Sequence, residues 1–171
     1  ARFQVDNNVA LYGGFVGNET TRAQRNAMAN PTTLSGDLLG DDLPNFVNRS
    51  DNSNEIVSSH QSLDHRAVLS GFTVRGANNG SAALNLDANA GMLISECLIT
   101  DNRAINGGAQ FLVFGGQLLL VNCRFINNLG IGGTGGGVYV EVDAGSATFS
   151  NCVFDGNQAF IGGGLYAAMY G

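Results

Sequence analysis

The acidic segment 36–54 holds the side chains with the clearest chemical potential in this chain. Asp37, Asp41 and Asp42 are grouped there, and Asp51 follows them. Carboxylates and backbone carbonyls are the oxygen ligands that Ca²⁺ prefers. The spacing is not that of an EF-hand loop, so solvated loop acids are the alternative interpretation. Asp37, Asp41 and Asp42 are therefore the candidate calcium ligands, and we expect no other cofactor.

A second group of metal-binding side chains lies in the run 60–65. His60, Asp64 and His65 could together bind Zn²⁺. On a strand or loop, however, the spacing places the two imidazole rings on opposite sides, and the sequence offers no evident fourth ligand. A structural role is therefore the favoured interpretation of these residues.

A repeated segment determines what must position these side chains. Each copy has an alternating apolar run, a Cys, an apolar residue two places later, and an Asn five places after the Cys. The copies are segments 92–102, 118–128 and 147–157, with a weaker copy at 67–77. Cys97, Cys123 and Cys152 are 26 and 29 residues apart. Such a period indicates a solenoid or another repeat architecture.

The alternation predicts strands, and one repeat holds about three short strands joined by three bends. The alternation breaks just before each cysteine position, which predicts a tight bend at Gly71, Glu96, Asn122 and Asn151. One unit cannot bury its apolar face alone, so the units must stack and align equivalent residues in inward columns. The columns are Phe72, Cys97, Cys123 and Cys152; Val74, Ile99, Phe125 and Phe154; Leu69, Ile94, Leu120 and Phe149; and Ala67, Met92, Leu118 and Ala147. Asn102, Asn128 and Asn157 should stack as an amide ladder at one bend. The fold class is therefore an all-β parallel β-helix of about six coils, right-handed because right-handed crossovers dominate.

The first part of the chain is less regular than the repeats. Residues 21–30 are expected to form a short helix, because Ala, Arg and Gln dominate the segment and Pro31 would end it. Segment 36–54 reads as one long polar loop that projects from the solenoid. Long loops of this kind commonly carry function.

Several motifs resemble those of a known group of proteins. They are the Tyr-Gly-Gly-Phe run at 12–15, Leu-Ser-Gly-Asp at 34–37, and the Asn-Cys-x-Phe-x-x-Asn and Gly-Gly-Gly-Val/Leu-Tyr repeats at 122–139 and 151–166. In these motifs the chain resembles secreted bacterial right-handed parallel β-helix proteins with polymorphic-outer-membrane-protein-like repeats, which share the pectin-lyase-like fold. The resemblance implies an extracellular or cell-surface location and a surface or adhesive role. It also implies that the single domain 1–171 is a fragment or trimmed form of a longer solenoid, since the Tyr-Gly-Gly-Phe run normally follows earlier coils.

Carbohydrate cleavage is the enzymatic use of this fold. A glycoside hydrolase would need two carboxylates facing one cleft, about 5–10 Å apart. A lyase would need acids that bind a metal, together with a base. The outward column of Arg75, Thr100, Ile126 and Asp155 mixes charge, hydroxyl and apolar groups and offers no pair of acids. The sequence therefore favours a non-catalytic protein.

Composition excludes two classes of partner. The chain has 171 residues and a net charge of −6, all eight basic residues are arginine, and no basic stripe is present. Nucleic acids and anionic membranes are therefore not expected as partners. No apolar run approaches the ~20 residues that span a bilayer. The three cysteines are expected to be buried thiols that pack as small apolar residues.

The outermost coils predict the function. Exposed strand edges and apolar columns promote further pairing, so head-to-tail stacking would give an open filament. The candidate assembly residues are Phe3, Val5, Leu165, Tyr166 and Tyr170. We therefore expect an extracellular fibre subunit, or a coil segment that contacts a neighbouring surface protein. The alternative is a glycan-binding or adhesive module, which a cleft lined by aromatic side chains would favour.

Overall fold

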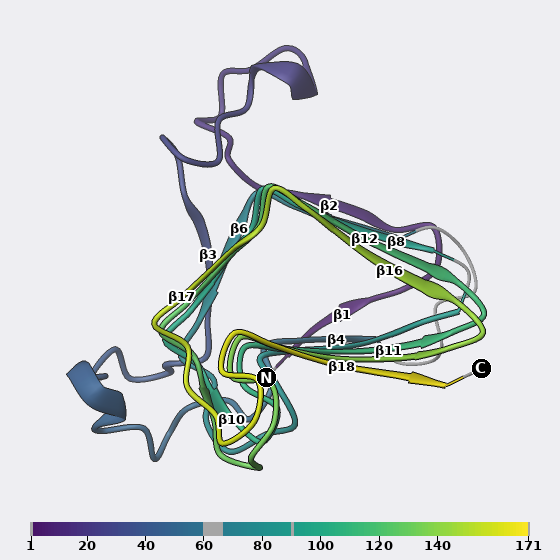
Figure 1. Cartoon of the computed structure of the whole chain (residues 1–171). Helices are drawn as coiled ribbons and strands as arrows, with labels where there is room; N and C mark the ends of the chain where they lie inside the picture. The colour runs from purple at the N-terminus through teal and green to yellow at the C-terminus, as the bar shows by residue number, and fades with distance from the viewer. Residues whose placement is uncertain (1, 60–66, 90, 171) are drawn as a thin grey trace.

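The computed structural model describes residues 2–59, 67–89 and 91–170. These residues wind into a parallel β-helix with a triangular cross-section, seen along its axis in Figure 1. Each side of the triangle is one parallel sheet, and the apolar core lies between the three sheets. Because every sheet faces the core on one side only, each strand alternates inward apolar and outward polar residues.

Consecutive strands belong to different sheets. Sheet A contains β1 (Phe3–Val5), β4 (Val57–Ser59), β7 (Leu84–Ala88), β11 (Ala109–Phe114), β15 (Val138–Asp143) and β18 (Leu165–Tyr170). Sheet B contains β2 (Ala10–Tyr12), β5 (Ala67–Ser70), β8 (Met92–Ser95), β12 (Gln117–Val121) and β16 (Ser146–Ser150). Sheet C contains β3 (Thr32–Ser35), β6 (Phe72–Arg75), β9 (Leu98–Thr100), β13 (Arg124–Ile126) and β17 (Val153–Asp155). The short pair β10 (Arg103–Ala104) and β14 (Leu129–Gly130) lies between sheets C and A.

The chain passes through sheets B, C and A in that order to complete one turn. About four regular turns run from β5 to β18. They are preceded by an interrupted turn, made of β2, β3 and β4, and by β1. The expected count of six coils was therefore slightly too high, because the first turn is stretched by two long insertions.

The strand register confirms the inward columns. Leu69, Ile94 and Leu120 are paired in register and fully buried, and Phe149 follows them on β16. Phe125 stacks on Phe154 with a centroid distance of 5.1 Å. Burial of these columns along the axis is the main source of stability.

The tight bends expected before each cysteine position are confirmed. They lie between sheets B and C at Gly71, Glu96, Asn122 and Asn151, with φ angles of 80°, 55°, 55° and 51°. Backbone in this left-handed region turns the chain within one residue, and glycine and asparagine adopt it at low cost. The bend aligns the column of Cys97, Cys123 and Cys152 toward the core.

The amide ladder is also present. The Asn102 Nδ2 donates to Asn128 Oδ1 at 3.0 Å, and the Asn128 Nδ2 donates to Asn157 Oδ1 at 2.9 Å. Each amide also donates to a main-chain carbonyl of the preceding turn, namely Val74 O, Ile99 O and Phe125 O. Asn102 and Asn128 are buried, so the ladder satisfies polar groups that water cannot reach.

The three thiols are free and pack in the core column. Cys97 Sγ lies 3.7 Å from the Leu69 carbonyl oxygen, and Cys123 Sγ lies 3.5 Å from the Ile94 carbonyl oxygen. The neighbouring Cys97 thiol, together with burial, raises the pKa of the Cys123 thiol above its ordinary value. Burial likewise raises the pKa of Cys152.

Two long excursions leave the first turn, at residues 13–31 and 36–56. They project from the two ends of the sheet C side of the triangle (Figure 1). Among the described residues no helix is long and apolar enough to cross a membrane. The second excursion contains the 3₁₀ turn η2 (Pro44–Phe46).

The helix expected at residues 21–30 is wrong: only the 3₁₀ turn η1 (Arg22–Gln24) forms. The Gln24 side chain accepts the Thr21 N–H at 3.0 Å and starts the turn, but Arg25 is extended. The Arg25 guanidinium donates to Ser70 Oγ at 2.8 Å and to Glu96 Oε2 at 2.5 Å. These tertiary contacts favour the extended backbone at Arg25 over a helix, and they hold the excursion against the solenoid.

Candidate functional site

A groove of about 520 Å³ lies outside the corner between sheets C and A. Its floor is the stack of bend residues that follow the sheet C strands, namely Gly76, Asp101, Asn127 and Gly156, with φ angles of 83°, 54°, 52° and 63°. One wall is the excursion around η2. Stacked strands lie about 4.8 Å apart, so the floor is roughly 14 Å long and suits an elongated ligand. We call this feature the corner groove.

Arg49 fixes the wall of the corner groove to its floor. Its side chain is only 7% exposed, and its Nη1 donates to the Asp101 carbonyl oxygen at 2.6 Å. Its Nη2 pairs with Asp42 Oδ2 at 3.3 Å, and its guanidinium lies 4.8 Å from the Phe46 ring centroid. The buried Nε has no hydrogen-bond partner among the described residues. A nearly buried, multiply bonded arginine holds this wall in one position.

Buried amides complete the support. The Asn52 Nδ2 donates to both Asp42 carboxylate oxygens at 3.1 Å and to the Gly76 carbonyl oxygen at 2.7 Å. The Asn78 Nδ2 donates to the Arg49 carbonyl oxygen at 2.7 Å. The wall is therefore tied to the second and third turns although its residues come from the first.

The groove surface is chemically mixed. Phe46 has a φ of 61°, a strained value for an aromatic residue, and such strain often marks a functional segment. Arg75, at the end of β6, also lines the groove; it is exposed and has no hydrogen-bond or ion-pair partner among the described residues. Amides from Asn45, Asn127 and Gln158 line the rest. An aromatic ring, a free guanidinium and several amides could bind a polar, elongated molecule.

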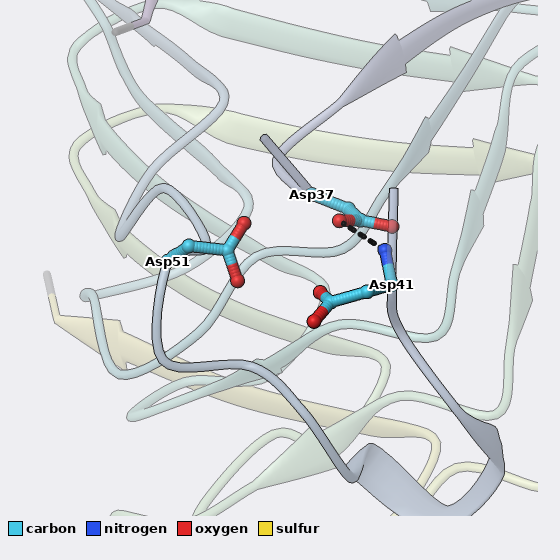
Figure 2. A group of neighbouring side chains, drawn as sticks. All are labelled: Asp37, Asp41 and Asp51. Carbon is cyan, nitrogen blue, oxygen red and sulfur yellow. Dashed lines mark hydrogen bonds between the residues drawn. The ribbon is translucent and has the colours of Figure 1, made fainter. Parts of the chain in front are cut away.

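The acidic segment divides into two parts. Figure 2 shows that Asp37, Asp41 and Asp51 converge, with ligand oxygens within 4.8 Å of one another. Asp42, the third candidate ligand, instead pairs with Arg49, so Asp51 takes its place. This arrangement could hold a cation, and calcium binding stays a prediction.

Main-chain hydrogen bonds already engage these carboxylates. Asp51 Oδ2 accepts the N–H groups of Leu38 and Leu39 at 3.0 and 2.9 Å. Asp37 Oδ1 accepts the N–H groups of Gly40 and Asp41 at 2.7 and 3.2 Å. The cluster therefore has a structural role in shaping the loop, whether or not it binds an ion.

The other predicted residues lie at separate places. Val5 is fully buried and faces the core, so it is not part of an exposed assembly surface, whereas Phe3 and Leu165 are exposed. Tyr166 and Tyr170 point outward from sheet A. The candidate zinc residues His60, Asp64 and His65 lie outside the described residues.

Sequence reasoning missed the residues that shape the corner groove, above all Arg49 and Phe46. Arg49 and Asp101 are 52 positions apart, and no periodicity relates an excursion to the turn it covers. One signal was available: Gly76, Asp101, Asn127 and Gly156 occupy equivalent positions after the second strand of each repeat. That equivalence could have identified the floor, but not the wall.

Comparison with known proteins gave one match. The family model for the right-handed β-helix region matches residues 48–168. No curated protein and no solved structure matches the chain.

Proposed function

Because the chain belongs to the family of right-handed β-helix regions, we propose that it is a non-catalytic structural module of an extracellular or cell-surface protein. The observation that carries this proposal is the incomplete burial of the core columns in the turn β16–β17–β18. Phe154 and Cys152 are only partly buried there, whereas Phe125 and Cys123 in the preceding turn are fully buried.

The same contrast holds in sheet A. Met169 is 77% exposed, whereas Val142, its register partner on β15, is 4% exposed. In the part of the chain that the structure describes, β16, β17 and β18 each pair with a neighbouring strand on one side only, and an unpaired strand edge favours pairing with another strand. We infer that this face stacks on another β-helix coil, which a longer polypeptide or a second copy can supply. A second copy would extend the solenoid into a fibre.

The hydrogen bonds and the ion pair of the acids that line the corner groove support a non-catalytic role. Two acids line the corner groove, and Asp42 is committed to Arg49 and Asn52. Asp101 accepts the Thr100 hydroxyl at 2.9 Å. Both carboxylates have hydrogen-bonding roles within the fold, as the acids of the neighbouring loop do.

The test compares two substitutions with equal starting exposure. Leu165 and Leu119 are each 39% exposed. Leu165 belongs to the end of the core columns that is exposed along the solenoid axis at β16–β18, which we call the axial surface, whereas Leu119 lies on the outer side of sheet B. We expect Leu165→Asp to abolish concentration-dependent association in sedimentation velocity and filaments in negative-stain electron microscopy. Leu119→Asp should leave both intact, and circular dichroism should show an unchanged β signal in both variants.

Two results would count against stacking between copies. Filaments that persist in Leu165→Asp would place the contact elsewhere. A wild-type chain that stays monomeric at every concentration would exclude the second copy as the partner.

The corner groove favours a second candidate, a glycan-binding or adhesive module. Phe46, Arg75 and the groove amides offer the stacking and hydrogen-bonding groups that a sugar chain requires. Binding would be measured on a glycan array, with and without calcium. We expect Phe46→Ala to abolish binding and Phe160→Ala, a highly exposed ring outside the groove, to preserve it. Equal binding by both variants would contradict this function.

A further inference from the structure

The outer face of sheet A differs in composition from the rest of the solenoid surface. By strand alternation, its outward residues are Asn85, Asp87, Gln110, Leu112, Phe114, Tyr139, Glu141, Asp143, Tyr166, Ala168 and Tyr170. Neither long excursion covers this side of the triangle (Figure 1). We call it the sheet A face. It does not include the corner groove or the axial surface of β16–β18.

The charge on the sheet A face has one sign. Its three formal charges at neutral pH are Asp87, Glu141 and Asp143, all carboxylates. None of the arginines that the structure describes belongs to a strand of sheet A. The nearest one in sequence, Arg2, pairs with Glu55 at 3.2 Å. Among the residues that the structure describes, no cation lies on this face, which therefore presents a negative potential to a partner.

Two of these carboxylates, Asp87 and Glu141, differ in their burial and hydrogen bonding. Asp87 is half-buried, its carboxylate has no partner among the described residues, and burial raises its pKa. Glu141 accepts the Tyr139 hydroxyl at 3.0 Å. Burial and this carboxylate raise the pKa of Tyr139 to about 12, so the phenol stays a neutral donor. The partly desolvated Asp87 would be stabilised by an approaching cation.

Aromatic side chains give the same face a rigid apolar part. The Tyr139 and Tyr166 rings stack with a centroid distance of 5.3 Å and an interplanar angle of 11°. Phe114 and Tyr170 are exposed at one margin of the face, in register with Asp143. Rigid aromatic groups lose little entropy on binding and are enriched at protein interfaces.

We propose that the sheet A face is a docking surface for a cationic segment of another polypeptide, rich in arginine or lysine. The ammonium or guanidinium groups would meet the three carboxylates. The aliphatic stems would pack on Leu112 and the tyrosine edges, as long basic side chains do on apolar surfaces. Arginine suits the site best, because its guanidinium can also stack on aromatic rings.

The register sets the spacing of the partner. Asp87 and Glu141 lie in one column, separated by the single strand β11. Their strands are therefore about 10 Å apart, which is the length of about three residues of extended chain. A segment that crosses the strands with basic residues at that interval would reach both carboxylates. This inference is independent of the proposed stacking function.

The experiment uses a fluorescein-labelled hexa-arginine peptide as the probe and measures its fluorescence anisotropy with the whole chain. A hexa-glutamate peptide is the negative control. The test variant is Asp87→Asn/Glu141→Gln/Asp143→Asn. The charge-matched control is Asp6→Asn/Glu19→Gln/Asp155→Asn, which removes three acids that lie outside both the sheet A face and the candidate calcium site. Urea unfolding should give similar midpoints for both variants, because the replaced side chains are not in the core.

We expect the face variant to weaken hexa-arginine binding by about tenfold, and the control to weaken it by less than about twofold. An equal loss in both variants would overturn the proposal, because the peptide would then respond only to net charge. Absence of hexa-arginine binding to the wild-type chain would also overturn it. A photo-reactive version of the peptide should cross-link to residues of β11 or β15, and cross-links confined to other elements would contradict the assigned face.

Two other occupants give different results. If the chain alone associates in sedimentation velocity and the face variant does not, the occupant is a second copy, and the cationic-segment proposal is wrong. If calcium displaces the peptide from both the wild-type chain and the control variant, in which the sheet A face is intact, the face binds a metal ion instead and the cationic-segment proposal is wrong.

Discussion

The regular turns from β5 to β18 and the first turn, β2 to β4, are stabilised in different ways. In the regular turns, apolar columns fill the core and one-residue bends join sheets B and C. In the first turn, two excursions leave the solenoid and are held by polar side chains such as Arg25, Arg49 and Asp51. The first kind of order repeats along the axis, and the second does not.

This difference indicates that the regular turns supply most of the folding stability, whereas the excursions supply the irregular surface beside them. A regular turn is stabilised by its two neighbours, so its contribution grows with each added repeat. An excursion buries few apolar side chains and depends on particular hydrogen bonds, so it can open without unfolding the solenoid. The corner groove forms where the two meet, because the excursion around η2 lies along the regular bends.

The largest effect should come from truncating the core column in a regular turn. Phe125 is fully buried and stacked on Phe154, so Phe125→Ala should lower the free energy of unfolding by about 3–5 kcal/mol. Leu34 lies in the same column in the first turn, at its edge, and Leu34→Ala should cost about 2 kcal/mol. Equilibrium urea unfolding followed by circular dichroism measures both values. Equal losses would mean that the first turn is as well packed as the others.

An intermediate loss of unfolding free energy is expected when either of two buried asparagines is replaced, and the loss should be larger in the regular turns than in the excursion. Asn128 donates to Ile99 O and Asn157 Oδ1 and accepts from Asn102. Asn128→Ala should cost about 2–3 kcal/mol, because the freed groups stay away from water. Asn52 in the second excursion donates to Asp42 and Gly76 O. Asn52→Ala should cost about 1 kcal/mol, since the excursion can shift and let water in.

Hydrogen exchange checks the same pair of variants. Asn52→Ala should speed exchange within residues 37–52 and leave the sheets protected. Asn128→Ala should speed exchange across the neighbouring turns. The comparison would fail if the two variants gave the same pattern.

The regular turns could be predicted from the sequence because their determinants are local. Alternation fixed the inward residues, and the residue before each cysteine position predicted the left-handed bends, such as Glu96 and Asn122. Each repeat carries the same signal, so several weak patterns support one register. The stacking of Asn102 on Asn128 follows from the equal spacing of the repeats.

The candidate site could be predicted only in part, because its contacts join segments that share no period. Asp51 rather than Asp42 faces Asp37, since Arg49 folds over the third turn and takes Asp42 as its partner. Arg25 prevents the expected helix in the same way, by reaching Glu96, which is 71 residues away. Both outcomes depend on how a long arginine side chain crosses turns, and composition does not encode that path.

The smallest expected effect concerns the tip of the first excursion. The exposed Glu19 carboxylate accepts the main-chain N–H groups of Val16 and Gly17 at 2.6 and 2.8 Å. These hydrogen bonds lower the Glu19 pKa below its ordinary value of 4.5. A depressed folded-state pKa means that the stabilising contact is fully present above pH about 4.5 and is lost as the pH falls through the folded pKa.

Acidification should therefore loosen the excursion tip before it affects the solenoid. In nuclear magnetic resonance spectra, the Val16 and Gly17 amide signals should shift with a midpoint below pH 4.5, while the Ile99 amide stays constant over that range. Glu19→Gln should remove the titration of both amides. A midpoint at or above 4.5 would show that the N–H groups do not favour the charged carboxylate. A simultaneous shift of Ile99 would show that the excursion and the regular turns respond as one unit, against the separation argued from their packing.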